Sequence, residues 1–493
     1  MNAHWLPNHI AQWYDDFCDG FPHAGIEEWS YWFERFRDGG YLPPSQDDSN
    51  EAKRLKNFKS ELETNPHYTA GRMDAYINEV GRSLVQQRRR FLALMLCSEA
   101  IQQKGFLVPT LLESGDEKDP WSGIIDKWMK HGNLLDSSGT ASGHLLADNA
   151  LRPWAGFRTR DDRKWDTGQR MPDRLFPGFV RLRESDFPGL RIRVKVLPNS
   201  HINKKVGEKI RVAVVPLLGA ITDLRIENNR DNPPSYRIWP QWDSGQLSAA
   251  VGQALRKSGE NDCDIVVFPE LCLIPEVQEK IPTQLRREKP WLVVAGSAYF
   301  LTDGEEQKYH NRALVYFKSS CDPILTHHKL QQELTVAPEK CFGVRQILGT
   351  PGAREDISTQ PREIEILETT VGRFTVLIGE DLCAQNFVNR LVDKVRLDWL
   401  LVPILEGHQT KTRWPAQFSQ RYASKGTAVV VATSQSFVTK HFNHEGISHP
   451  ASLGVGLVTV PFRSGSTVHV LECATAIDHT EPVPFDVYGI DWQ

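Results

Sequence analysis

The chain has 493 residues, of which 24% are charged and 40% hydrophobic, and its formal net charge is -4. This composition is typical of a globular protein and excludes a disordered chain, and the length favours two domains. The charge balance gives no global attraction to nucleic acid. No run of about 18 apolar residues predicts a membrane span, and the first residues do not resemble a secretory signal. We therefore expect a cytoplasmic protein without membrane contact.

Residues 1 to about 195 predict a mostly helical N-terminal domain of unknown type. They lack regular strand-like alternation and contain eight of the fourteen tryptophans. Apolar residues recur near helical spacing from Ala70 to Gln103, which predicts one long helix ended by Gly105. The basic run Arg88 to Arg90 within it is interpreted as a solvated helix face.

Residues 205 to about 480 predict a second domain with a different pattern. Short runs of β-branched residues alternate with helix-length segments, which indicates an α/β layered domain with a central sheet. The predicted strands are 210–216, 264–268, 291–296, 313–317, 374–378, 399–403 and 428–432, and the helical segments include 245–257, 385–395 and 414–425. The strands are continuously apolar, so we expect both faces of the sheet to be covered.

Three strand ends carry residues that could work together. Glu270 follows the predicted strand 264–268, Lys329 ends a further strand in Pro323-Ile-Leu-Thr-His-His-Lys329, and Gly379 follows the strand 374–378. Ligands of layered sheets bind beyond such strand ends. A carboxylate and an ammonium beside a thiol suit amide or nitrile chemistry, because the carboxylate takes the thiol proton while the ammonium stabilises an oxyanion. The eight cysteines form no Cys-x-x-Cys pair, so neither a metal site nor a cofactor is expected.

Seven segments in order carry a resemblance to a known family. They are Arg211-Val-Ala-Val-Val-Pro, Phe268-Pro-Glu270, Asn311-Arg-Ala-Leu-Val-Tyr-Phe with His327-His-Lys-Leu330, Val376-Leu-Ile-Gly-Glu-Asp-Leu382, Asp398-Trp-Leu-Leu-Val-Pro403, Gln420-Arg-Tyr-Ala-Ser-Lys-Gly-Thr-Ala-Val-Val430 and Ser452-Leu-Gly-Val-Gly456. With them, residues 207 to about 465 resemble the nitrilase, or carbon-nitrogen hydrolase, superfamily. The resemblance implies an α-β-β-α sandwich, with Glu270 as general base and Lys329 as oxyanion stabiliser. It implies a second carboxylate at Glu339, with Glu333 as the alternative.

The sequence departs from the family at the nucleophile. Where the family has Cys before an acidic pair, this chain reads Ile378-Gly-Glu-Asp-Leu382, so Gly379 occupies the nucleophile position. Cys383 is the alternative nucleophile, about 6 Å further along if the segment is α-helical. Cys272 lies two residues beyond Glu270, on the same loop, and is a weaker alternative.

Two functions follow from this departure. The first is a nitrilase-like protein with a degenerate nucleophile site, retained as a binding or assembly module for a small amide or carboxylate ligand. The second is an active carbon-nitrogen hydrolase that uses Cys383. The resemblance implies a homo-oligomer, and the N-terminal domain is expected to contact a protein partner. Related domains occur beside reverse transcriptases in bacterial defence systems, which makes a reverse transcriptase one hypothesis for that partner.

Overall fold

The computed structural model describes residues 6–20, 50–81, 84–105, 143–147, 179–183, 186–197, 202, 209–218, 223–229, 234–301, 308–330, 353–369, 371–446, 448, 450, 452–462, 465–474 and 486–490. The chain divides into two compact units, Met1–Pro188 and Gly189–Gln493. Among the described residues, no helix combines the length and the apolar character needed to span a bilayer.

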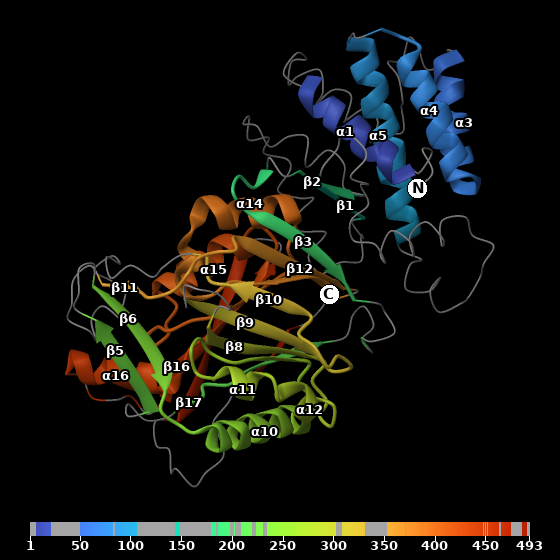
Figure 1. Ribbon diagram of the computed structural model, residues 1–493. Helices are drawn as coiled ribbons and strands as arrows, with labels where there is room; N and C mark the ends of the chain where they lie inside the picture. The colour runs from blue at the N-terminus through green and yellow to red at the C-terminus, as the bar shows by residue number, and fades with distance from the viewer. Residues whose placement is uncertain are drawn as a thin grey trace. The chain divides into compact units, whose positions relative to one another are not determined.

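The N-terminal unit is mostly helical, as the sequence predicts (Figure 1). Its helices bury aromatic side chains such as Trp13, Phe58 and Phe91 in one core. A short antiparallel pair of strands, which the sequence analysis did not predict, belongs to the same unit. The elements are α1 (Leu6–Gly20), α3 (Asn50–Thr64), α4 (Pro66–Asn78), α5 (Leu84–Gly105), β1 (Gly143–Ala147) and β2 (Phe179–Arg183).

The prediction of one helix from Ala70 to Gln103 is wrong, because the structure has two helices there. α4 ends at Asn78 and α5 begins at Leu84. Gly81 lies in the break, where glycine disfavours a continuous helix. The break lets α4 and α5 pack against each other and share the helical core. Hydrophobic periodicity runs through both helices, so periodicity alone did not reveal the turn.

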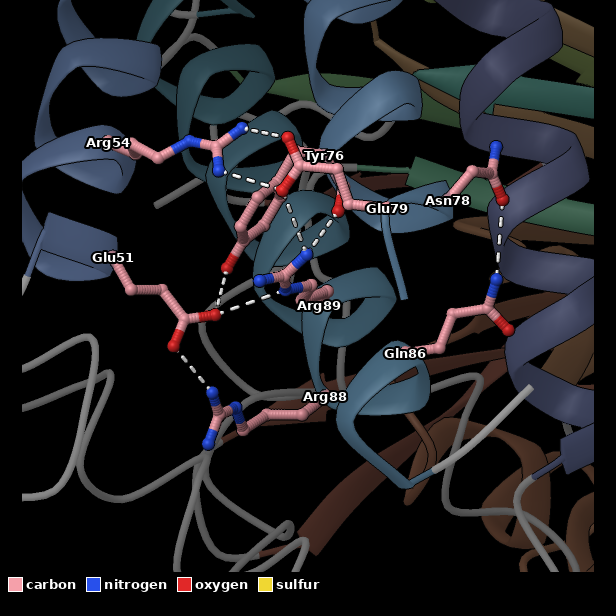
Figure 2. A network of polar contacts seen from close by, with 8 residues as sticks. All are labelled: Glu51, Arg54, Tyr76, Asn78, Glu79, Gln86, Arg88 and Arg89. Carbon is pink, nitrogen blue, oxygen red and sulfur yellow. Dashed lines mark hydrogen bonds and ion pairs between the residues drawn. The ribbon is translucent and has the colours of Figure 1, made fainter. Parts of the chain in front are cut away.

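The interpretation of Arg88 to Arg90 as a solvated face is also wrong. Their side chains are only 16%, 13% and 12% exposed, and each forms an ion pair. Figure 2 shows the network: Glu51 of α3 accepts hydrogen bonds from Arg88 (2.7 Å), from Arg89 (3.1 Å) and from the Tyr76 hydroxyl (2.6 Å). The basic run therefore joins α5 to its neighbours.

The second unit contains a six-stranded sheet in the order β10-β9-β8-β7-β4-β18. β4, β7 and β8 are parallel, and the remaining neighbours are antiparallel. The central strands are apolar and buried on both faces. Their bounds are β4 (Ile210–Val214), β7 (Ile265–Val267), β8 (Leu292–Leu301), β9 (Tyr309–Phe317), β10 (Leu325–His328) and β18 (Asp486–Ile490).

A seven-stranded sheet has the order β17-β16-β15-β14-β13-β12-β3. β13, β14 and β15 are parallel and fully buried. β3 pairs in parallel with β12 at the end of the sheet. The bounds are β3 (Arg191–Val196), β12 (Glu363–Thr369), β13 (Gly372–Val376), β14 (Trp399–Pro403), β15 (Ala428–Ala432), β16 (Ser452–Phe462) and β17 (Gly465–Ala474).

The two sheets face each other and helices cover their outer faces (Figure 1). β14 lies against β7 and β8, and β10 lies against β12. The predicted α-β-β-α sandwich, preceded by a mostly helical region, is confirmed. The helices are α10 (Ser244–Glu260), α11 (Pro275–Gln278) and α12 (Ile281–Leu285) on one side, and α14 (Gln385–Val395) and α15 (Trp414–Ala423) on the other, while α16 (Gln435–Glu445) lies beside β16.

A small third sheet lies beside the sandwich strands. A hairpin of β5 (Leu224–Asn229) and β6 (Ser235–Pro240) follows β4, and the two-residue strand β11 (Arg354–Glu355) pairs in parallel with β6. Asp243 then caps α10 in a capping box with Gln246. This small sheet matters for the site because it holds the backbone of Glu355.

Candidate active site

Glu270 lies in the turn that follows β7, and the neighbouring strand β8 shapes that turn. β8 bulges before Ser297, whose N–H donates a hydrogen bond to the Pro269 carbonyl. The bulge requires glycine at Gly296, where φ is +61° and an added Cβ would lie 2.1 Å from the Pro269 oxygen. The backbone therefore fixes the turn, which leaves Glu270 only 1% exposed.

Lys329 follows β10 directly and continues its pairing with β9. Its N–H donates to the Asn311 carbonyl at 2.9 Å. Because side chains alternate along a strand, Lys329 and His327 share one face and His328 takes the other. Lys329 and His327 are 1% and 2% exposed, whereas His328 is half-buried. Burial lowers the pKa of His327 to about 3, with His328 and Lys195 adding to the effect, so its imidazole is neutral near pH 7.

The structure brings Glu270 and Lys329 together with a second glutamate. Lys329 Nζ donates to Glu270 Oε1 at 2.7 Å and to Glu355 Oε2 at 2.6 Å. The Asn311 side-chain nitrogen donates to Oε1 of both glutamates at 2.9 Å. All four residues are 1% exposed. We call Glu270, Asn311, Lys329 and Glu355 the charged centre.

Sequence reasoning missed Glu355. It lies 26 residues after Lys329 along the chain, and no motif marks it. Its position depends on the pairing of β11 with β6, which places Glu355 opposite Tyr236. The Tyr299 hydroxyl donates to Glu355 Oε1 at 3.2 Å. Asn311 belongs to a motif noted in the sequence, but its bridging position was not foreseen. Glu339 and Glu333 lie outside the described residues.

Gly379 begins a five-residue 3-10 helix, η7 (Gly379–Cys383), directly against the charged centre. Its φ is +57°, a conformation that favours glycine. A Cβ at this position would lie 2.7 Å from Glu270 Oε2 and 3.0 Å from Lys329 Nζ. The space that the first atom of a side chain needs is thus occupied by the glutamate and the lysine.

Cys383 lies at the opposite end of η7. A 3-10 helix rises about 2 Å per residue, so four residues place Cys383 about 8 Å further along the helix axis than Gly379. This is longer than the separation expected for an α-helix. Burial raises the pKa of the Tyr422 hydroxyl and the neighbouring Cys383 adds to the effect; this hydroxyl donates to the Leu382 carbonyl at 2.9 Å. Cys272 is buried with its Sγ donating to the Glu270 carbonyl at 3.3 Å, and burial raises the pKa of its thiol.

Carboxylates surround the charged centre. Burial raises the pKa of Glu380 to about 7, and Lys329 opposes this effect while Glu270 adds to it. Burial also raises the pKa of Asp381 to about 7. Its Oδ2 accepts from the Leu330 N–H at 2.9 Å, and its Oδ1 is shielded from solvent and has no hydrogen-bond partner among the described residues. Both carboxyl groups therefore carry a proton part of the time at neutral pH.

Glu406, in the loop after β14, is a further buried carboxylate. Burial raises its pKa to about 6, while Arg413 and Trp414 oppose the shift. Arg413 lies 3.1 Å from Glu406 Oε1, and the Trp414 indole N–H donates to Oε2. Within the described ranges, no group of three or more His, Cys, Asp or Glu residues is arranged to hold a metal ion.

No protein-family model matches the chain, and no curated protein matches its sequence. Nit3 of Saccharomyces cerevisiae, described as a member of branch 10 of the nitrilase superfamily, is 16% identical with a TM-score of 0.37; the match covers 59% of this chain and 92% of Nit3.

Two further solved structures are similar to a comparable extent. An amidase from Nesterenkonia sp. is 13% identical with a TM-score of 0.37, covering 59% of this chain and 94% of the amidase. The C. elegans NitFhit protein is 16% identical with a TM-score of 0.38, covering 58% of this chain and 62% of NitFhit. Of the similar structures, Nit3 and a variant of an amidase from Nesterenkonia AN1 are described as belonging to the nitrilase superfamily.

Proposed function

We propose that this protein is a nitrilase-like protein that has lost thiol chemistry and acts as a binding or assembly module. Gly379 takes the nucleophile position and supplies no nucleophile. The observation that carries the proposal is the contact of Gly379 with the glutamate and the lysine: a Cβ there would lie 2.7 Å from Glu270 Oε2. Two atoms closer than van der Waals contact cannot both stay in place, so a cysteine fits only after the ion pair moves.

The remaining chemistry of the centre supports this proposal. Lys329 forms ion pairs with two carboxylates, at 2.7 Å and 2.6 Å, and all three side chains are buried. The positive charge of a lysine held this way is already balanced by the glutamates. Freeing the lysine to bind an oxyanion would leave a buried carboxylate unpaired. A small amide could instead bind by exchanging hydrogen bonds with the glutamates, which leaves Lys329 paired.

Electrophile labelling separates this function from that of a hydrolase. The wild-type protein is treated with iodoacetamide at pH 8 and mapped by mass spectrometry, and ammonia release is followed with a panel of amides and nitriles. We expect no release of ammonia. We also expect any labelling of Cys383 to be unaffected by Glu270→Gln. Stoichiometric labelling of Cys383 that Glu270→Gln abolishes would establish the competing hydrolase and end this proposal.

Restoring the thiol provides the complementary measurement. Gly379→Cys introduces a thiol next to Glu270 and Lys329 once their side chains have shifted to admit its Cβ, so we expect iodoacetamide to label position 379. Glu270→Gln in the same background removes the base and is expected to slow labelling at least about tenfold. If the rates with and without Glu270 are equal, Glu270 is not positioned as a base for that site.

Assembly is the second part of the proposal. From the resemblance we infer a homo-oligomer, so light scattering should give a mass that is a multiple of 56.0 kDa. We also propose a protein partner for the helical unit, with a reverse transcriptase as the first one to test by co-purification with the full chain. A monomer that retains no partner would contradict the assembly role.

A further inference from the structure

The strand pair that carries Lys329 and Asn311 holds a second group of polar residues on its opposite face. In the antiparallel pair β9–β10, His328 lies directly opposite Arg312, and in β8–β9 Phe300 lies opposite His310. Residues opposite each other share a face, and residues two apart along β9 do too. His310, Arg312 and His328 therefore form one cluster, on the face where Leu314 and Tyr316 enter the core with α10 and α12.

Three nitrogen atoms of this cluster lack a hydrogen-bond partner among the described residues. His310 Nδ1, Arg312 Nε and His328 Nδ1 are shielded from solvent but have no hydrogen-bond partner in the part of the chain that the structure describes. The two imidazole rings meet edge to face with centroids 5.2 Å apart. The Arg312 guanidinium lies 3.7 Å from the Phe300 ring centroid. Shielded polar atoms are normally paired, so three in one cluster need an explanation.

The charge of the cluster indicates what kind of group would pair these atoms. Burial lowers the pKa of Arg312 while Glu279 opposes the shift, but the described structure contains no ion pair between them. Burial, Arg312 and His310 together lower the pKa of His328 to about 4. The cluster thus holds one arginine charge and two imidazoles that would donate hydrogen bonds when protonated. An oxyanion satisfies both needs, because its oxygens accept from several N–H groups and its charge offsets the arginine.

We propose that His310, Arg312 and His328 form a binding site for an oxyanionic group, a phosphate or a carboxylate. Arg312 supplies the charge and the two histidines supply directional N–H groups. The site lies on the opposite face of β9 and β10 from the charged centre, and it does not depend on whether that centre is catalytic.

Calorimetric titration of the full-length protein with inorganic phosphate, and separately with acetate, tests the site at pH 6 and constant ionic strength. We expect saturable binding of at least one of them, and the preferred anion identifies the class. Arg312→Gln should weaken it about tenfold or more, because a charge-assisted hydrogen bond is lost. Arg312→Lys keeps the charge and should recover part of the affinity. Arg191→Gln removes an arginine that is 70% exposed on β3 and should change nothing.

A pH series with sulfate, whose charge is constant over this range, tests the histidines. A bound anion favours protonated imidazoles, so affinity should rise as the pH falls from 8 to 5, and His328→Gln should reduce that rise. Glu279 and Tyr316 also act on Arg312, and the Ser358 backbone acts on His310. Glu279→Gln should therefore strengthen binding at every pH. Absence of saturable binding, or equal weakening by Arg191→Gln and Arg312→Gln, would overturn the site.

Discussion

At the residue scale, one glycine and two glutamates define the chemistry of the centre. Gly379 has positive φ and contacts Glu270 and Lys329, while Glu355 balances the lysine from the other side. One ammonium and two carboxylates leave the buried set with excess negative charge. Such a set persists only when each charge has partners, and Asn311 with Tyr299 provides hydrogen bonds for the glutamates.

Gly379→Ala should destabilise the protein more than Gly446→Ala. The two glycines have similar φ, +57° and +65°, but a Cβ at 446 meets nothing within 4 Å. Gly446→Ala should therefore cost only the left-handed strain, about 1 to 2 kcal/mol. Gly379→Ala adds the displacement of Glu270 and should cost at least about 1 kcal/mol more. Urea unfolding measures the free energy of unfolding of both variants. Equal losses would show that Glu270 and Lys329 move aside for the added Cβ at no cost.

Asp381→Asn should make stability less dependent on pH. Burial raises the pKa of Asp381 from 3.8 to about 7, so the folded state holds the proton more tightly than the unfolded state. Its contribution to stability therefore falls as the pH rises from about 4 to 7. Asn cannot ionise, so the variant should gain stability relative to wild type at pH 8 compared with pH 5. Asp322→Asn at an exposed position is the control, and a profile for Asp381→Asn parallel to wild type would contradict the argument.

At the element scale, the ends of β7, β10 and β13 bring distant residues together, while a hairpin outside the sandwich completes the site. β11 pairs with β6, and Glu355 enters the centre from that pairing. In the N-terminal unit, polar contacts of the same kind join helices. Burial would raise the pKa of Glu51, but the Tyr76 hydroxyl, Arg88 and Arg89 outweigh it and lower the pKa. The carboxylate is thus held ionised between α3, α4 and α5 (Figure 2).

Glu51→Ala should destabilise the helical unit by about 2 kcal/mol, because it leaves Arg88 and Arg89 without their shared partner. Glu61→Ala on the same helix breaks the pair with Arg72, which is 45% exposed, and should cost less than about 1 kcal/mol. Hydrogen exchange of α3, α4 and α5 amides reports both losses locally. Comparable protection in the two variants would show that the network contributes little.

At the scale of the whole molecule, the chain forms two compact units, and β3 belongs to the second one although it precedes the predicted start of that domain near residue 205. Two ion pairs join β3 to β12: Arg193 Nε lies 3.0 Å from Glu363 Oε1, and Lys195 Nζ lies 2.7 Å from Glu365 Oε1. The assignment of residues 1–195 and 205–480 to separate domains stays a prediction.

A fragment of residues 189–493 should unfold at a higher temperature than one of residues 198–493. The shorter fragment lacks β3, so β12 loses a full parallel partner and exposes its backbone groups and its glutamates. Calorimetry and light scattering compare the melting temperatures and the tendency to aggregate. Identical melting curves would show that β3 adds nothing to the sheet.

The sequence by itself determined an α/β layered domain and the positions of Glu270, Lys329 and Gly379 at three strand ends, and the family resemblance implied the sandwich. Continuous apolar runs and turn residues are local signals, so they mark buried strands and the loops after them. The helix break at Gly81 and the burial of Arg88 to Arg90 depend on packing between helices, which periodicity does not encode. Only the tertiary structure decided that Glu355 joins the centre, that Gly379 leaves no space for a Cβ, and that η7 carries Cys383 further away. Each of these depends on contacts between segments that are distant along the chain, and no local pattern specifies such contacts.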